Sequence, residues 1–236
     1  MPNRFFVALF TTLAFLACAA NTRLLADVTL YSQQTDNNNL LASQNDTGMF
    51  GFGNFATAYD NFTLATANSV DAVTWVGSYY NPQIHGTITA FTLKIYANSG
   101  GTPGAVLNTT SLSGNAGETS LGSDNLGDLE YSYSANLSTA FAAAAGTEYW
   151  LSIVPDLAFP PQWGWEDSSG AGDPGDHHAY QVYMGTGSGQ STDLAFTLRG
   201  NPAGAVPEPY SVALLGTVLG LIAIGARRRK GSVPQC

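Results

Sequence analysis

Apolar and polar residues alternate with a period of two in several short segments, and this pattern indicates β-strands. The clearest case places Phe91, Leu93 and Ile95 on one face and polar or amphipathic residues on the other. That segment is predicted to be a half-buried strand. Residues 70–76 alternate less cleanly, which favours a strand covered on both faces.

Turn-forming clusters of Gly, Asn, Asp and Ser separate these segments at short intervals. The other predicted strands are residues 28–33, 57–64, 105–112, 129–137, 149–154, 163–166, 179–184 and 193–199. About ten short strands without helical periodicity predict an all-β fold, an antiparallel β-sandwich with a jelly-roll-like arrangement. The alanine-rich residues 138–145 are predicted to form one turn of helix.

A different pattern occupies the C-terminal end. Residues 210–226 carry no charge, and the cations Arg227, Arg228, Arg229 and Lys230 follow directly. Seventeen residues span roughly 25 Å as a helix, which is at the short end for crossing a bilayer. The sequence therefore predicts one transmembrane helix, with its basic end in the cytoplasm and the body of the chain on the other side.

The residues before that segment are Val206, Pro207, Glu208 and Pro209. The prolines favour an extended backbone, which suits capture in the cleft of a processing enzyme. The order of Pro-Glu-Pro, hydrophobic segment and basic cluster resembles the PEP-CTERM sorting segment of Gram-negative bacteria. The resemblance implies that exosortase, a membrane cysteine peptidase, removes or exchanges the tail during export. A retained tail anchor with a proline-rich stalk is the alternative.

The N-terminus also carries an export pattern. Arg4 precedes an apolar run over residues 5–20, followed by small residues, as in a secretory signal peptide. Cleavage after Ala19 and cleavage after Ala26 both fit the pattern. Cys18 adds lipoprotein processing as a third alternative.

These segments divide the chain into five parts. We expect a signal peptide at 1–26, a β-sandwich ectodomain at 27–200, a linker with the Pro-Glu-Pro motif at 201–209, a transmembrane helix at 210–226 and a basic tail at 227–236.

Charge excludes one class of partner. The span 27–200 carries 16 acidic and two basic residues, a formal net charge of −14. Such a domain repels phosphate backbones, so we expect no nucleic-acid binding.

The two cysteines of the chain, Cys18 and Cys236, lie in the terminal segments. The predicted ectodomain therefore has no disulfide, thiolate zinc site or cysteine nucleophile.

Candidate chemistry in the body is sparse. His177 and His178 lie near Asp173 and Asp176 in a turn, where a metal cluster or a solvated loop are the two interpretations. Adjacent strand residues point to opposite faces, so the neighbouring Glu166 and Asp167 do not form a glycosidase pair. We therefore predict no catalytic residues, no metal site and no cofactor.

Trp163 and Trp165 are the candidate ligand-binding residues. Their i, i+2 spacing places both on one face of a strand. If that face is outward, the pair would form a sugar-binding platform; if it is inward, they are core residues, which is the usual place of large aromatic side chains.

The sequence therefore predicts a non-catalytic exported protein, not an enzyme. A second resemblance supports the predicted fold and adds no chemistry: residues 58–62, 73–77, 91–96, 101–104 and 146–153 look like a sandwich domain common in exported PEP-CTERM proteins, with no assigned activity. The expected partners are exosortase and the inner membrane during export, followed by release to the cell surface or the extracellular space. A carbohydrate-binding module acting on exopolysaccharide is the alternative function.

Overall fold

The computed structural model describes residues 28–168 and 174–202, and every regular element in them is a β-strand. The all-β prediction is therefore confirmed for these residues. The signal peptide, the Pro-Glu-Pro motif, the apolar segment 210–226 and the basic cluster lie outside them. Within residues 28–168 and 174–202, no helix has the length and apolarity needed to cross a membrane.

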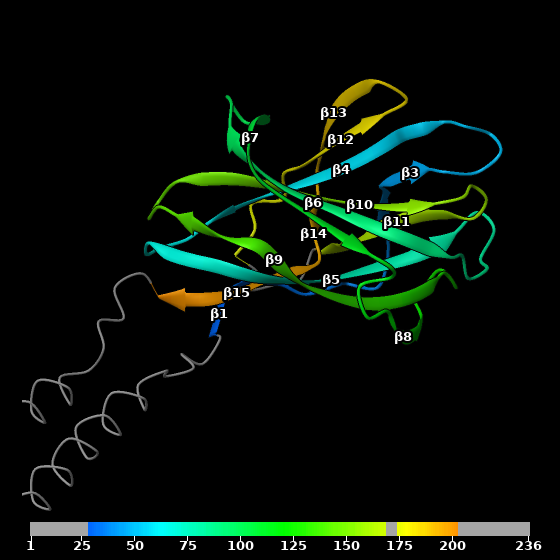
Figure 1. Ribbon diagram of the computed structural model, residues 1–236, viewed down its shortest axis with the longest axis horizontal. Helices are drawn as coiled ribbons and strands as arrows, with labels where there is room; N and C mark the ends of the chain where they lie inside the picture. Colours follow the sequence, from blue (N-terminus) through cyan, green and yellow to red (C-terminus); the bar gives the residue numbers. More distant parts are fainter. Residues whose placement is uncertain (1–27, 169–173, 203–236) are drawn as a thin grey trace, which may run out of the picture.

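Fifteen strands build two facing sheets (Figure 1). They are β1 (Val28–Gln33), β2 (Leu40–Ala42), β3 (Gln44–Asp46), β4 (Gly53–Thr63), β5 (Asn68–Tyr80), β6 (Ile88–Asn98), β7 (Pro103–Ser113), β8 (Thr119–Ser123), β9 (Leu129–Ala143), β10 (Glu148–Leu157), β11 (Gln162–Ser168), β12 (Ala179–Tyr183), β13 (Thr186–Gln190), β14 (Asp193–Leu194) and β15 (Phe196–Pro202). All pairings are antiparallel except the short pairing of β3 with β10.

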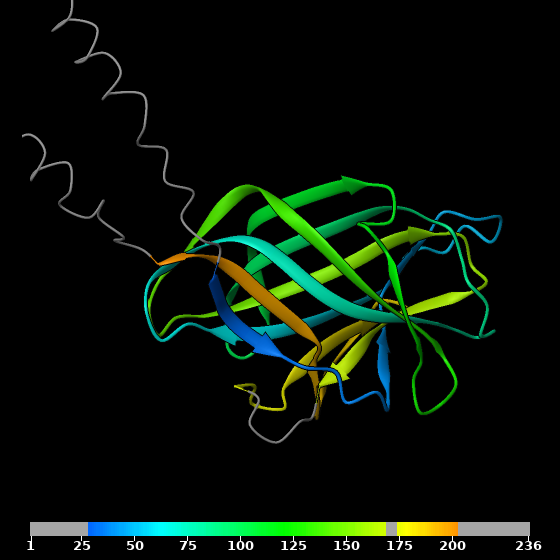
Figure 2. The same ribbon diagram turned by 90° about the horizontal axis from the view of Figure 1, so that it is seen from below.

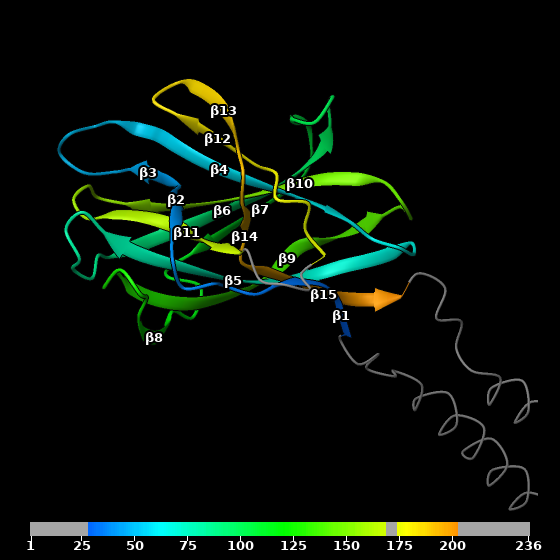
Figure 3. The same ribbon diagram turned by 180° about the vertical axis from the view of Figure 1, so that it is seen from behind.

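Eight strands form the frame of the sandwich. The first sheet pairs β1, β15, β5 and β9 in that order, and the second pairs β4, β10, β6 and β7. Along the chain these strands pass from sheet to sheet at every step except the β6–β7 hairpin. This connectivity agrees with the jelly-roll-like prediction. The shorter strands extend the sheets, and the β12–β13 hairpin projects beyond the second one (Figure 3).

The two sheets approach each other along one side, where β7 lies beside β9 (Figure 2). There the Asn108 side-chain amide donates a hydrogen bond to the Thr139 carbonyl at 2.9 Å, and the Thr110 and Ser138 hydroxyls lie 3.2 Å apart. The sandwich therefore closes on this side into a half-barrel. The helical turn predicted at 138–145 is wrong, because β9 continues to Ala143 by pairing with β5 and this pairing outweighs the helix propensity of alanine.

Aromatic side chains dominate the core between the sheets. Trp75 stacks on Tyr133 with ring centroids 5.6 Å apart, and Phe91 packs edge-on against both. The alternation predicted around Phe91 is confirmed, since Phe91, Leu93 and Ile95 are buried and Lys94 is not. In residues 70–76 of β5 one face is fully buried and the other, with Thr74, is only half-buried, so the predicted cover of both faces is partial there; both faces are buried at residues 77–79.

The two ends of the described chain lie at the same end of the sandwich. Val28 of β1 pairs with Gly200 of β15, because β1 and β15 run antiparallel as neighbours. The last paired residue is Pro202, opposite Asn68. The sandwich is thus complete between residues 28 and 202.

Candidate functional site

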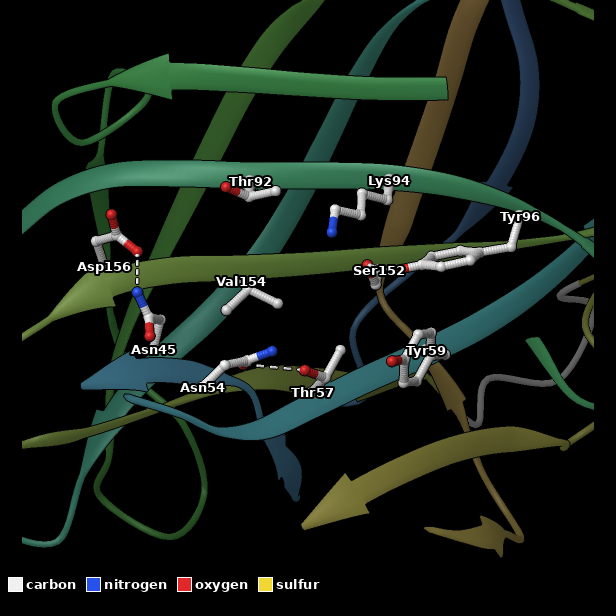
Figure 4. A pocket seen from close by; sticks show the side chains of 10 residues that line it. All are labelled: Asn45, Asn54, Thr57, Tyr59, Thr92, Lys94, Tyr96, Ser152, Val154 and Asp156. Carbon is white, nitrogen blue, oxygen red and sulfur yellow. Dashed lines mark hydrogen bonds between the residues drawn. The ribbon is translucent and has the colours of Figure 1, made fainter. Parts of the chain in front are cut away.

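The outer face of the second sheet carries a polar groove of about 300 Å³ (Figure 4). Alternation along β4, β6 and β10 sends one set of side chains to the core and the other set to this face. The groove is lined by Asn45, Asn54, Thr57, Tyr59, Thr92, Lys94, Tyr96, Ser152, Val154 and Asp156. Nine of these ten side chains are polar, so the groove is suited to a ligand rich in hydrogen-bonding groups.

Strand register arranges three of the groove's side chains, with Tyr180 beside them, in one row. Tyr180 of β12 pairs with Tyr59 of β4, Tyr59 pairs with Ser152 of β10, and Ser152 pairs with Lys94 of β6. Neighbouring strands lie about 4.8 Å apart, so the row extends over about 14 Å. It crosses strands that are far apart in the sequence, and an elongated ligand lying across the strands would meet Tyr180, Tyr59 and Lys94, with the buried Ser152 beneath it.

Tyrosine side chains form one wall of the groove. The rings of Tyr59 and Tyr96 meet edge to face with centroids 5.4 Å apart, and Tyr180 lies 6.2 Å from Tyr59. Burial and the neighbouring Tyr96 raise the pKa of Tyr59 to about 12, and burial also raises the pKa of Tyr96. Both phenols therefore remain neutral at physiological pH and can donate or accept hydrogen bonds.

The groove contains one cation and one anion that do not pair with each other. Asp156 accepts a hydrogen bond of 2.7 Å from the Asn45 side-chain amide. The Lys94 ammonium makes no ion pair or hydrogen bond with any residue in 28–168 or 174–202. Figure 4 shows its ammonium extending into the middle of the groove, between the side chains of Thr92 and Tyr96. A bound ligand would meet this free ammonium.

The histidine pair helps to close one end of this face. His178 packs edge-on against the fully buried Trp150, with ring centroids 5.5 Å apart. The backbone amides of His177 and His178 donate to Asp193, at 3.0 and 3.2 Å. In the part of the chain that the structure describes, no three His, Cys, Asp or Glu side chains are arranged to hold a metal ion, and Asp173 lies outside that part.

Of the two interpretations of Trp163 and Trp165, the structure shows that they are core residues and not a sugar-binding platform. Both side chains are fully buried in the core. The Trp163 indole N–H donates to the Tyr133 hydroxyl at 3.1 Å, and that of Trp165 donates to the Ala195 carbonyl at 2.9 Å. The shared face of β11 is thus its inward face, which is the alternative that the sequence left open.

A cluster of buried carboxylates lies on the opposite face of β11. Glu130 of β9 and Gly164 of β11 both pair with Ser78 of β5. Glu166 lies two residues beyond Gly164 and therefore on the same face of β11. Asp124 and Asp128, in the loop before β9, are also buried. We call Glu166, Glu130, Asp124 and Asp128 the acid cluster.

Two loops cover the acid cluster. The Asp167 amide donates to the Asn39 carbonyl, and the Asn125 amide donates to the Asn37 carbonyl, both at 2.9 Å. Neither carboxylate oxygen of Glu166 has a hydrogen-bond partner in the described residues. Burial raises the pKa of Glu166 to about 8, and the neighbouring Glu130 and Asp124 add to this rise. A buried carboxyl group without access to substrate does not form a hydrolytic pair.

A second exposed feature borders the groove beyond Asn54. Phe50 and Phe52 stack in parallel with centroids 5.8 Å apart, and both contact Phe159 edge-on. Each of the two is about half exposed. Neither this aromatic tip nor the groove was predicted from the sequence. The outward positions of Thr92, Lys94 and Tyr96 were the available signal for the groove.

Residues 31–199 match the family described as "Domain of unknown function (DUF7901)". Residues 205–230 match the PEP-CTERM protein-sorting motif, which confirms that resemblance. No curated protein matches the chain. The motif implies export through a membrane-anchored stage, with exosortase as the processing partner.

Proposed function

We propose that this chain, which belongs to the DUF7901 family and is a PEP-CTERM protein, is a non-catalytic protein of the cell surface or extracellular matrix. Exosortase processes it at the C-terminal end, after transient anchoring in the inner membrane. The match of residues 205–230 to the sorting motif carries this proposal.

The fold supports processing at both ends. The sandwich is complete between residues 28 and 202, and both of these ends lie on the same side of the domain. Cleavage before Val28 and beyond Val206 removes no paired strand. The processed product therefore keeps every hydrogen-bonded ladder of the described domain.

The chemistry of the groove supports a binding role without catalysis. Hydrolysis of a glycosidic bond ordinarily uses two carboxyl groups on either side of the bond. Asp156 is the single carboxylate among the residues that line the groove, and Asn45 already binds it. The acid cluster lies on the other sheet beneath two loops.

Intact mass of the surface-associated protein tests the processing proposal. We expect the mature protein to lack Arg227 to Lys230, and alanine substitution of Pro207, Glu208 and Pro209 to leave an uncleaved, membrane-held form. Pro234→Ala, beyond the basic cluster, is the matched control and should be processed normally. Mature protein that retains its C-terminus through Cys236 would show instead that the tail is a permanent anchor.

The polar groove favours carbohydrate binding as a second candidate function. Aromatic side chains together with hydroxyl and amide groups suit sugars, which present apolar ring faces and many hydroxyls. Tyr59, Tyr96 and Tyr180 supply the aromatic surface and their own hydroxyls, and Thr92 supplies a further hydroxyl. This groove takes the place of Trp163 and Trp165 as the candidate sugar-binding site.

Retention of the exported protein on host exopolysaccharide tests this second function. Tyr59→Ala should reduce retention, because it removes the central ring of the row. Tyr131→Ala on the first sheet is the control and should leave retention unchanged. Failure of the parent protein to be retained on any polysaccharide would remove the second function and leave the processing proposal intact.

A further inference from the structure

Lys94 is one of only two basic residues in the described residues, where 14 residues are acidic. The other, Arg199, lies on β15 of the first sheet. A single lysine at the centre of the groove is therefore the only positive charge that the second sheet presents among these residues. Its position is the observation from which a ligand class can be inferred.

The direct cross-strand neighbours of Lys94 carry hydroxyl groups and no carboxylate. Its cross-strand neighbours are Ser152 on β10 and Thr109 on β7. The acidic residues on the same face of β10, Glu148 and Asp156, are each four residues from Ser152, or about 13 Å along the strand.

Both of these carboxylates already have partners. Asp156 accepts from Asn45 at 2.7 Å, and Glu148 accepts from the Asn98 side-chain amide at 3.0 Å. Neither carboxylate forms an ion pair with Lys94 in residues 28–168 and 174–202.

A ligand that fills the groove must cover this ammonium and displace its water. Covering a charge costs free energy unless the ligand supplies a partner for it. A neutral sugar supplies only hydroxyls, whereas a carboxylate also supplies the opposite charge and forms the stronger, charge-assisted hydrogen bond. The geometry therefore selects for a negatively charged ligand at the centre of the groove.

We propose that the groove binds a polysaccharide containing uronic acid units, whose carboxylate pairs with the Lys94 ammonium while neighbouring units contact Tyr59 and Tyr96. This inference rests on the proposed carbohydrate-binding function and names its ligand class. The acidic body repels a polyanion elsewhere, so binding of such a polymer requires this local site and is not nonspecific adsorption.

Binding of the exported, processed protein to two forms of one polymer tests the inference. The probes are oligomers of polygalacturonate and the same oligomers with their carboxyl groups methyl-esterified. We expect tighter binding of the acid form. Lys94→Gln should weaken it by about tenfold or more, the usual effect of losing a hydrogen bond to a charged group. Lys94→Arg should retain most of the binding because it retains the charge.

Arg199→Gln removes the other cation and is the matched control, which should bind both probes like the parent. Melting curves of all variants show whether each is folded. Equal binding of both probes by the parent, unchanged in Lys94→Gln, would overturn the acidic-ligand inference and keep the carbohydrate function. No binding of either probe or of neutral dextran by folded parent protein would overturn the inference and the carbohydrate function together.

Discussion

Replacing Glu166 with glutamine should make the domain more stable at alkaline pH and change its stability little near pH 5. Glu166 is fully buried, and neither carboxylate oxygen has a hydrogen-bond partner in the described residues. Glutamine has nearly the same shape but carries no charge. The substitution therefore isolates the cost of ionising this group inside the protein.

No described cation offsets that charge. Arg199 lies opposite Ala72 on β5, six residues from Ser78, which is about 20 Å along the strand. Lys94 is on the other sheet. The nearest charges in the acid cluster are Glu130 and Asp124, and both disfavour a second negative charge.

The magnitude follows from the pKa of Glu166, which burial raises from 4.5 to about 8. At 1.36 kcal/mol per pH unit, such a rise corresponds to at most about 5 kcal/mol. Local relaxation around the ionised group lowers the effective cost. We therefore expect a difference of roughly 2–4 kcal/mol between the acid and alkaline limits.

The sign is determined by which state holds the proton. Below pH 4.5 the carboxyl group is protonated in both the folded and the unfolded chain. Between pH 4.5 and about 8 the folded state retains a proton that the unfolded state releases, so the free energy of unfolding falls as pH rises. The stability advantage of Glu166→Gln should therefore grow across this interval and level off above it.

Urea denaturation followed by tryptophan fluorescence at pH 5, 6, 7 and 8 provides the measurement. Other buried acids also titrate, and burial raises the pKa of Asp167 to about 6, so the informative quantity is the difference between variant and parent. Gln162→Met on the same strand is the control, since it changes a buried polar group that does not titrate. A difference between Glu166→Gln and parent that is constant from pH 5 to 8 would refute the reasoning.

Two further predictions concern the core and the unit of folding. Trp165→Ala should lower the free energy of unfolding by about 3–5 kcal/mol, because Trp165 is a core residue. Polysaccharide retention per folded molecule should stay unchanged, because Trp165 is remote from the groove. Loss of retention with an unchanged melting temperature would contradict this prediction. Residues 27–200 expressed alone should give a β-rich circular dichroism spectrum and one cooperative melt that reductant does not alter, since this span lacks cysteine. A helical spectrum or a reductant-sensitive melt would count against it.

Local patterns were sufficient where one face of a strand is buried and the other is solvated. Phe91, Leu93 and Ile95 show that alternation, and β6 was predicted correctly from it. In β11 every residue is buried, so the pattern of period two is lost and the direction of Trp163 and Trp165 was undetermined. Covering loops decide this burial, and they come from distant parts of the chain.

The groove was beyond local reasoning for a related reason. Alternation placed Lys94 on an outward face, but its neighbours there depend on strand order and register. A slip of one residue would turn the same side chains toward the core. Likewise, Glu166 was recognisable as an acid next to Asp167, but its burial follows from the loops near Asn39 and Asn125.

By itself, the sequence determined the all-β class, the cysteine-free acidic body and the C-terminal sorting motif, because composition, short-range alternation and contiguous motifs are properties of neighbouring residues. The tertiary structure alone decided that Tyr59, Ser152 and Lys94 form one row, that the β11 tryptophans face inward and that the carboxylates of the acid cluster share one covered site. These features depend on pairing between strands that are up to about a hundred residues apart, and local sequence does not encode that register.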